Sequence, residues 1–180
     1  SNGTLDFKTL QRNGKSLFEV VAPIKNEKDY KNAIAYLIAK RAIEKADQGM
    51  DTGFPIESAR QVVKELDGQF GVMQKEIVDY QNRIVDYMVD SGIIAKKDAD
   101  SMKEANQDYV PFFRVLDPSV KDKNAAFGKA VFNPYKKMRG GEQPIFNPLE
   151  SIVNNTMHHV VIAERNKSFV DFIEMVEKAP

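Results

Sequence analysis

The last part of the chain predicts one helix of about 30 residues, and this length restricts the fold more than any other feature of the sequence. Asn147 can cap the helix, Pro148 suits its first position, and Glu150 stands three residues after the cap. The segment 147–178 would then be a helix roughly 45 Å long, which either spans a bundle or extends past it to a partner. The side chains expected to face the bundle are Ile152, Val153, Met157, Val160, Val161, Phe169, Phe172, Ile173 and Val176.

Residues 3–105 predict a β-hairpin followed by helices. Asn13-Gly14 favours a type I′ turn, which would pair the residues after Gly14 with the strand before Asn13. Asn26 can cap a helix that stops at Gly49. Three more helices are expected after Pro55 to about residue 68, from about 70 to 91, and from about 96 to 105. The expected fold class is therefore a mainly α helical bundle with a small N-terminal β-hairpin, forming one domain over residues 1–180.

Residues 106–146 interrupt the helical pattern. This stretch holds four of the eight prolines in the chain and has no clear helical period. Between residues 119 and 141, six Lys and Arg face a single Asp, so the local charge is about +5 although the whole chain has a net charge of zero. We expect a long irregular segment that is basic and aromatic.

Composition excludes several classes of protein. The chain has no Cys, which rules out disulfide scaffolds, thiol nucleophiles and Cys-based metal sites. It has no apolar run of the roughly 18 residues that a membrane helix needs. Ser1-Asn2 is typical of the scar left by tag cleavage, which suggests a module excised from a larger multi-domain protein.

Side chains that could perform chemistry are few and scattered. His158 and His159 are adjacent, so they point about 100° apart on a helix and cannot share a metal ion. We expect one hydrogen-bonded core histidine and one surface histidine. Asp98, Asp100 and Glu104 lack the glycine of a calcium loop and predict a solvated acidic face. The sequence therefore predicts no catalytic residues, no metal site and no cofactor.

The basic segment is the candidate for nucleic-acid binding. Its cations alternate with aromatic side chains, a mixture that suits phosphate neutralisation and base stacking. The alternative is that its aromatic side chains anchor the segment to the core while its lysines solvate it. The candidate residues are Lys121, Lys123, Lys129, Lys136, Lys137, Arg139 and Tyr135.

Several short motifs together resemble a large polyvalent-protein-associated domain of phage, prophage and mobile-element proteins. They lie at residues 13–15, 18–20, 40–42, 52–53, 86–92, 108–114, 139–141, 147–152 and 163–166. The most specific are Tyr-Val-Pro-Phe at 109–112 and Pro-Leu-Glu-Ser at 148–151. The resemblance covers nearly the whole chain. It implies a module of very long multi-domain proteins in the cytoplasm of a bacterial host, or delivered with the virion, and it implies no active site.

These observations predict a non-catalytic interaction module. Its expected partners are the neighbouring domains of the parent polyprotein, or a second copy that pairs along the C-terminal helix, with no membrane involved. Weak nucleic-acid binding by residues 119–141 is the first alternative. The second is an enzyme, which would require Arg114, Arg139, His158 and Glu164 to meet in one cleft.

Overall fold

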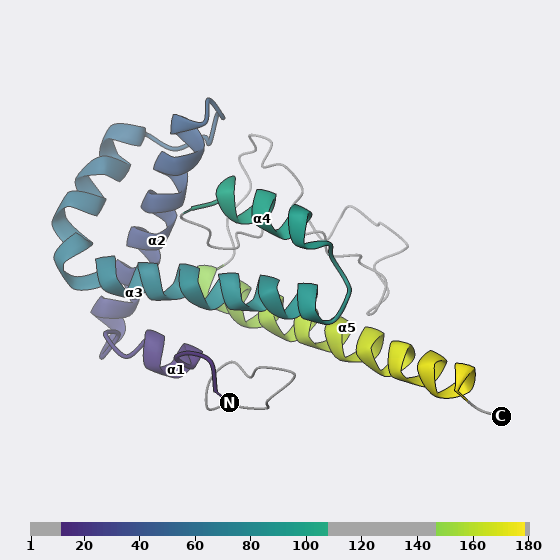
Figure 1. Cartoon of the computed structure of the whole chain (residues 1–180). Coiled ribbons are helices and arrows are strands. Elements are labelled where there is room, and N and C mark those ends of the chain that lie inside the picture. The colour runs from purple at the N-terminus through teal and green to yellow at the C-terminus, as the bar shows by residue number, and fades with distance from the viewer. Residues whose placement is uncertain (1–11, 108–146, 179–180) are drawn as a thin grey trace, which may run out of the picture.

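The computed structural model describes residues 12–107 and 147–178, and these residues form helices joined by short connections (Figure 1). The helices in chain order are α1 (Leu17–Val20), α2 (Glu27–Asp47), α3 (Ile56–Asp90), α4 (Lys96–Glu104) and α5 (Pro148–Glu177). The expectation of a mainly α-helical protein is confirmed for this part of the chain.

Helix α3 is the centre of the arrangement. It contacts each of the other four helices, and α2 also contacts α5. Figure 1 shows that α3 bends, so that its first part runs beside α2 and its second part runs beside α5. The far end of α5 extends beyond the other helices.

The apolar core lies between α2, the middle of α3 and the start of α5. Tyr36 and Phe70 are fully buried, with their ring centroids 6.2 Å apart. The hydroxyl of Tyr36 donates a hydrogen bond of 2.5 Å to the carboxylate of Asp67, so its one polar atom is satisfied. The buried cluster contains Val20, Ala33, Tyr36, Leu37, Phe70, Met73, Ile77, Tyr80, Ile84 and Ile152.

The predicted N-terminal β-hairpin is wrong. The residues expected to form its second strand contain helix α1, and the described residues contain no strand. Ser16 and Glu19 form a reciprocal capping box, in which each side chain binds the backbone N–H of the other residue. Gly14 is not among the described glycines with positive φ, so the type I′ turn that Asn13-Gly14 favours does not form. The Ser-x-x-Glu signal therefore outweighs the Asn-Gly signal.

The predicted helix end near Gly68 is also wrong. Helix α3 continues through Gly68 and Gly71 as one helix of 35 residues. Glycine inside a helix lowers stability without ending it, and paired small residues are a common cause of bends. Phe70, between the two glycines, is completely buried, so tertiary packing holds the helix together at its weakest point.

The other helix predictions are confirmed. The side chain of Asn26 accepts a hydrogen bond of 2.9 Å from the backbone of Asp29 at the start of α2, and Gly49 follows its end with φ 77°. Asn147 accepts one of 3.0 Å from Leu149 at the start of α5. Helix α4 occupies the expected residues. Apart from Asn106 and Gln107, the predicted irregular segment 106–146 lies outside the described residues.

Candidate functional site: the two faces of α5

Helix α5 buries a polar stripe. Ser151, Asn155 and His159 lie four residues apart, which places them on one face of the helix. Each is at most 3% exposed. The side-chain amide of Asn155 donates a hydrogen bond of 3.1 Å to the side-chain oxygen of Gln81, which is itself buried on α3. The contact between α5 and α3 is therefore strongly polar.

Several polar atoms in this stripe lack hydrogen-bond partners. They are Ser151 Oγ, Asn155 Oδ1, His159 Nδ1 and, on α3, Gln81 Nε2. The expected core histidine is thus present as His159, but it is not fully hydrogen-bonded. Burial, with a smaller effect from the neighbouring His158, lowers the pKa of His159 to about 4. His159 is consequently neutral at pH 7, and charging it in place would be costly.

Two further polar contacts follow along the same pair of helices. Tyr87 on α3 donates a hydrogen bond of 2.5 Å to the carboxylate of Glu164 on α5. Burial, followed by this hydrogen bond, raises the pKa of Tyr87. The side chain of Asn166 donates a hydrogen bond of 2.6 Å to the backbone carbonyl of Ser91, just after the end of α3. Beyond Asn166, α5 extends past the other described helices (Figure 1).

The opposite face of α5 carries apolar side chains that are exposed. Val153, Met157 and Val161, also spaced by four residues, are 44%, 62% and 47% exposed. The sequence predicts that these residues face the bundle, and this prediction is wrong. The apolar set and the polar set both recur every four residues, so periodicity alone could not show which side packs on α3.

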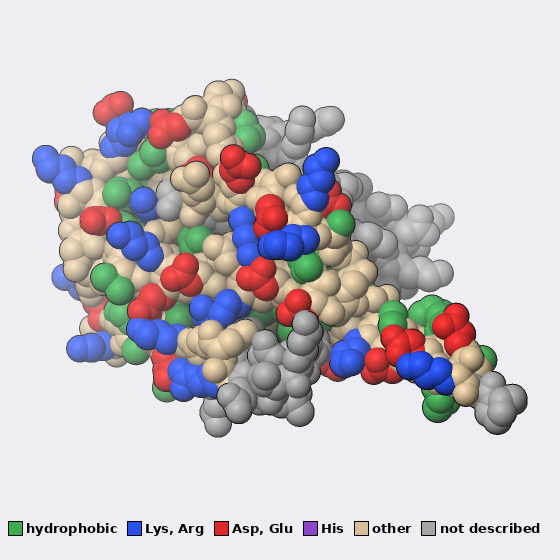
Figure 2. All heavy atoms as spheres, viewed as in Figure 1, with side chains coloured by type: hydrophobic (Ala, Val, Ile, Leu, Met, Phe, Trp, Pro, Cys, Tyr) green, Lys and Arg blue, Asp and Glu red, His purple; other side chains and the backbone are tan. Residues whose placement is uncertain are grey.

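The last turns of α5 form a projecting segment, residues 168–178, in which every residue is exposed. Figure 2 shows this segment standing out from the body, with apolar side chains between charged ones. Its exposed large apolar residues are Phe169, Val170, Phe172, Ile173, Met175 and Val176. Folded monomers rarely expose many large apolar side chains so close together, and such patches mark interaction sites.

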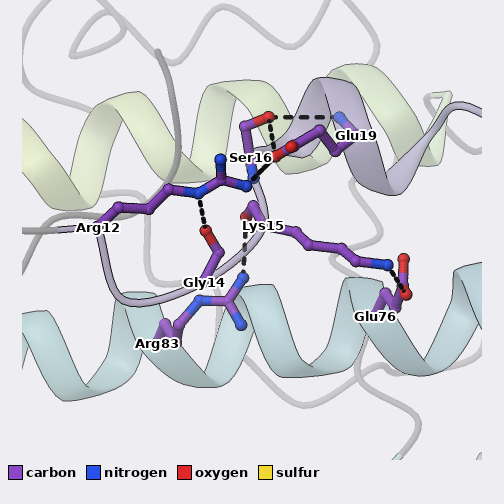
Figure 3. Close-up of polar contacts among 7 residues, drawn as sticks. All are labelled: Arg12, Gly14, Lys15, Ser16, Glu19, Glu76 and Arg83. Atoms are coloured by element: carbon purple, nitrogen blue, oxygen red, sulfur yellow. Dashed lines mark hydrogen bonds and ion pairs between the residues drawn. The ribbon is translucent and has the colours of Figure 1, made fainter.

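A polar clamp holds the N-terminal turn on α3 (Figure 3). Arg83 on α3 donates a hydrogen bond of 3.0 Å to the carbonyl of Lys15, and Lys15 forms an ion pair with Glu76. A Cβ atom on Gly14 would lie 2.4 Å from the Arg83 guanidinium carbon, so any other residue would force this side chain to move. Because the guanidinium is the end of a long flexible side chain, rotation of Arg83 could relieve this clash.

The same turn is closed by an ion pair at its exposed edge (Figure 3). Arg12 pairs with Glu19 and donates a second hydrogen bond of 2.7 Å to the carbonyl of Gly14. The Arg12 hydrogen bond, together with hydrogen bonds from Ser16, lowers the pKa of Glu19 to about 2. These groups bind one another, so their role is to hold the turn together. They do not form a binding site for a ligand.

A second polar cluster joins α2 to the residues after α4. Arg41 and Lys45 are buried and both donate hydrogen bonds to Asn106 Oδ1, of 2.8 and 3.1 Å. Glu44 forms an ion pair with Arg41. Burial, followed by the charge of Arg41, lowers the pKa of Lys45. The cluster fixes the residues that follow α4 against α2.

A groove of about 670 Å³ lies beside this cluster. The described residues that line it are Lys40, Ile43, Glu44, Asp47, Gln48, Arg60, Val63, Lys64, Glu104 and Gln107. Its cations and carboxylates are equal in number, and Arg60 is bound to Asp47 at 3.0 Å. The described lining of the groove therefore has no excess charge of either sign that would select an ionic ligand.

The candidate nucleic-acid residues lie outside the described residues, as do Arg114 and Arg139 of the enzyme hypothesis. His158 and Glu164 are both on α5, but six positions separate them, so they point about 120° apart around the axis. Asp100 forms an ion pair with Lys96 at 3.3 Å on the exposed side of α4. Within residues 12–107 and 147–178, no three His, Asp or Glu side chains lie close enough together to hold a metal ion.

Comparison with known proteins gives no match: no protein-family model, curated protein or solved structure resembles the chain closely enough to be identified with it. Among the described helices, none is both long and apolar enough to cross a membrane. The exposed and buried faces of α5 are therefore the features of the described structure that bear on function.

Proposed function

We propose that this chain is a non-catalytic interaction module whose binding surface is the projecting segment of α5, residues 168–178. The observation that carries the proposal is the projecting segment 168–178, which exposes six large apolar side chains away from the core. Burying one such side chain is worth about 1.5 to 3 kcal/mol. A partner that covers several of them gains enough free energy to bind stably.

The polar attachment of α5 supports the same proposal. Helix α5 buries Ser151, Asn155 and His159. It exposes Val153 and Met157, so these two side chains contribute little free energy of apolar burial to its packing on the body. Its apolar side chains are available to another surface. The resemblance to polyvalent-protein domains suggests that this surface belongs to a neighbouring domain of a long phage or prophage protein, or to a second copy.

Site-specific photo-cross-linking tests the proposal. A photoreactive phenylalanine analogue replaces Phe172 in bacterial cells that produce the chain. The matched control carries the analogue at Val72, an isolated apolar residue on α3 that is 72% exposed. We expect a discrete cross-linked species from position 172, several-fold stronger than from position 72. Equal yields from the two positions would contradict a binding surface on α5.

Nucleic-acid binding by residues 119–141 is a second candidate, favoured by the local charge of about +5. Titration of labelled single- and double-stranded DNA at low and moderate salt tests it. Changing both Lys136 and Lys137 to Ala should weaken binding and flatten its salt dependence. Absence of binding at low salt would remove this candidate without affecting the α5 proposal.

A further inference from the structure

The second half of α5 has the residue spacing of a coiled-coil seam. Ile162, Arg165, Phe169, Phe172 and Val176 follow one another at intervals of three, four, three and four residues. This spacing keeps one side of a helix in contact with a second helix over several turns. Phe169, Phe172 and Val176 are each more than half exposed. Ile162 is half-buried, and from Arg165 onward the seam is formed by exposed side chains.

The residues beside this seam carry no charge. They are Val161, Asn166, Ser168, Ile173 and Met175. The charged side chains in the same turns lie on the other sides of the helix, and several pair with each other there. Lys167 lies 3.2 Å from Asp171, and Lys178 lies 3.2 Å from Glu174. Two identical helices can consequently meet along the seam without bringing like charges together at its edges.

Arg165 is the one charged residue in the seam, and it determines the direction of pairing. In a parallel pair, Arg165 of one chain would face Arg165 of the other, which is unfavourable for two like charges. In an antiparallel pair with Phe169 opposite Phe172, Arg165 faces Val176, and the two arginines are about 16 Å apart along the helix. Antiparallel pairing also places the two bodies at opposite ends, because each body lies beside the first part of its own α5 (Figure 1).

We propose that the occupant of this surface is a second copy of the same chain, paired antiparallel through α5 with Phe169 of each copy against Phe172 of the other. This inference rests on the proposed function, because it names the partner of the same surface. The interface is then isologous: both copies contribute the same surface, so each contact between two seam residues occurs twice.

Sedimentation of the purified chain tests the pairing. We expect a concentration-dependent dimer for the wild-type chain. The Phe172→Ser variant should raise the dissociation constant at least tenfold, whereas Val72→Ser, which changes a similarly exposed residue on α3, should leave it unchanged. Circular dichroism establishes that both variants keep their helical content. A wild-type chain that remains monomeric at all concentrations would overturn the inference.

Cross-linking between two variants tests the direction, since the chain has no native Cys. Ser168 and Met175 lie on the same edge of the seam and oppose each other in the antiparallel pair. A short bismaleimide should therefore link Ser168→Cys to Met175→Cys efficiently in a mixture of the two variants. The control mixture of Lys167→Cys and Glu174→Cys has the same separation along the helix but faces outward, and it should link poorly. Equal linking within one variant alone, or in the control mixture, would contradict the antiparallel pairing.

The two proposals fail in different ways. A monomeric chain that still cross-links from position 172 to another protein would overturn the self-pairing and support the interaction module. A chain that shows neither self-association nor preferential cross-linking from position 172 would overturn both.

Discussion

The contact of α3 with α2 and its contact with α5 are built from different chemistry. The α2 contact contains Tyr36, Leu37, Phe70, Met73 and Ile77, all nearly or completely buried. The α5 contact begins with Ile152, which joins the same core, but then continues through buried polar side chains. One helix thus holds two neighbours, one by apolar packing and the other mainly by hydrogen bonds.

These two kinds of contact should contribute unequally to the stability of the molecule. Apolar burial contributes about 25 cal/mol per Å² of buried surface, whereas a hydrogen bond contributes about 1 kcal/mol net. A buried polar atom without a partner costs stability. The α2–α3 packing should therefore set the global free energy of unfolding. The attachment of α5 should be weaker and more easily disturbed.

The largest expected effect is in the α2–α3 core. Phe70→Ala removes a completely buried ring and leaves a cavity beside Tyr36. We expect the free energy of unfolding to fall by about 3–5 kcal/mol. Urea unfolding followed by circular dichroism measures this. The control Val72→Ala, two residues away but exposed, should change it by less than about 0.5 kcal/mol. Similar losses for both variants would mean that α3 does not pack as described.

Acid should act on the α5 contact through His159. Its pKa is about 4 in the folded chain and about 6.5 when unfolded, so the unfolded chain binds more protons between these values. The stability that depends on a neutral His159 is complete above pH 6.5 and is lost as the pH falls toward 4. The loss is at most about 3 kcal/mol.

The variant His159→Gln isolates this effect, because glutamine is polar but does not titrate. Unfolding free energies at pH 7 and pH 4.5 are compared for both chains. The wild-type value should fall by about 2 to 3 kcal/mol more than that of the variant. Parallel decreases in the two chains would exclude His159 as the acid-sensitive group.

The hydrogen bond between Asn155 and Gln81 gives a smaller effect. Asn155→Ala leaves the buried amide of Gln81 without its partner and should cost about 1–3 kcal/mol. Replacing both residues by apolar ones of similar shape, Asn155→Leu with Gln81→Met, should restore much of that loss. A double-mutant cycle by urea unfolding measures the coupling. Additive losses would show that the two side chains do not depend on each other.

The sequence predicts the helices well because their ends carry local signals. Asn26 and Asn147 occupy the cap positions that their side chains suggest, and Gly49 ends α2 in a left-handed conformation. Local signals gave a wrong prediction at the N-terminal end, where two of them favoured different structures. Asn13-Gly14 favoured a hairpin, while Ser16 and Glu19 three residues apart specified a helix.

The orientation of α5 could not be predicted from the sequence. Val153 and Met157 have the spacing of a core-facing stripe, but so do Ser151 and Asn155 on the other side. Hydrophobicity favours burying the first pair, and the structure buries the second. Four-residue spacing of Ser, Asn and His was the available signal for a polar contact. Recognising it requires the partner Gln81, which is 74 residues away from Asn155 in the sequence.

The smallest expected effect compares the two helix caps. Asn26→Ala and Asn147→Ala each remove one side-chain acceptor, of hydrogen bonds 2.9 and 3.0 Å long, and each should cost about 1 kcal/mol locally. The caps differ in what their helices rest on. Because the core holds α2, loss of the Asn26 cap should lower the global free energy of unfolding. It should reduce the protection of amides throughout α2 and α3.

For Asn147→Ala, native-state hydrogen exchange should show the loss mainly in the amides of α5. Even in the wild-type chain, the opening free energy of α5 should be lower than that of α2, because polar contacts hold α5 where apolar burial holds α2. If Asn147→Ala instead reduced protection equally in α2, α3 and α5, all three helices would unfold as one unit. The polar contact would then hold α5 as firmly as the apolar core holds α2.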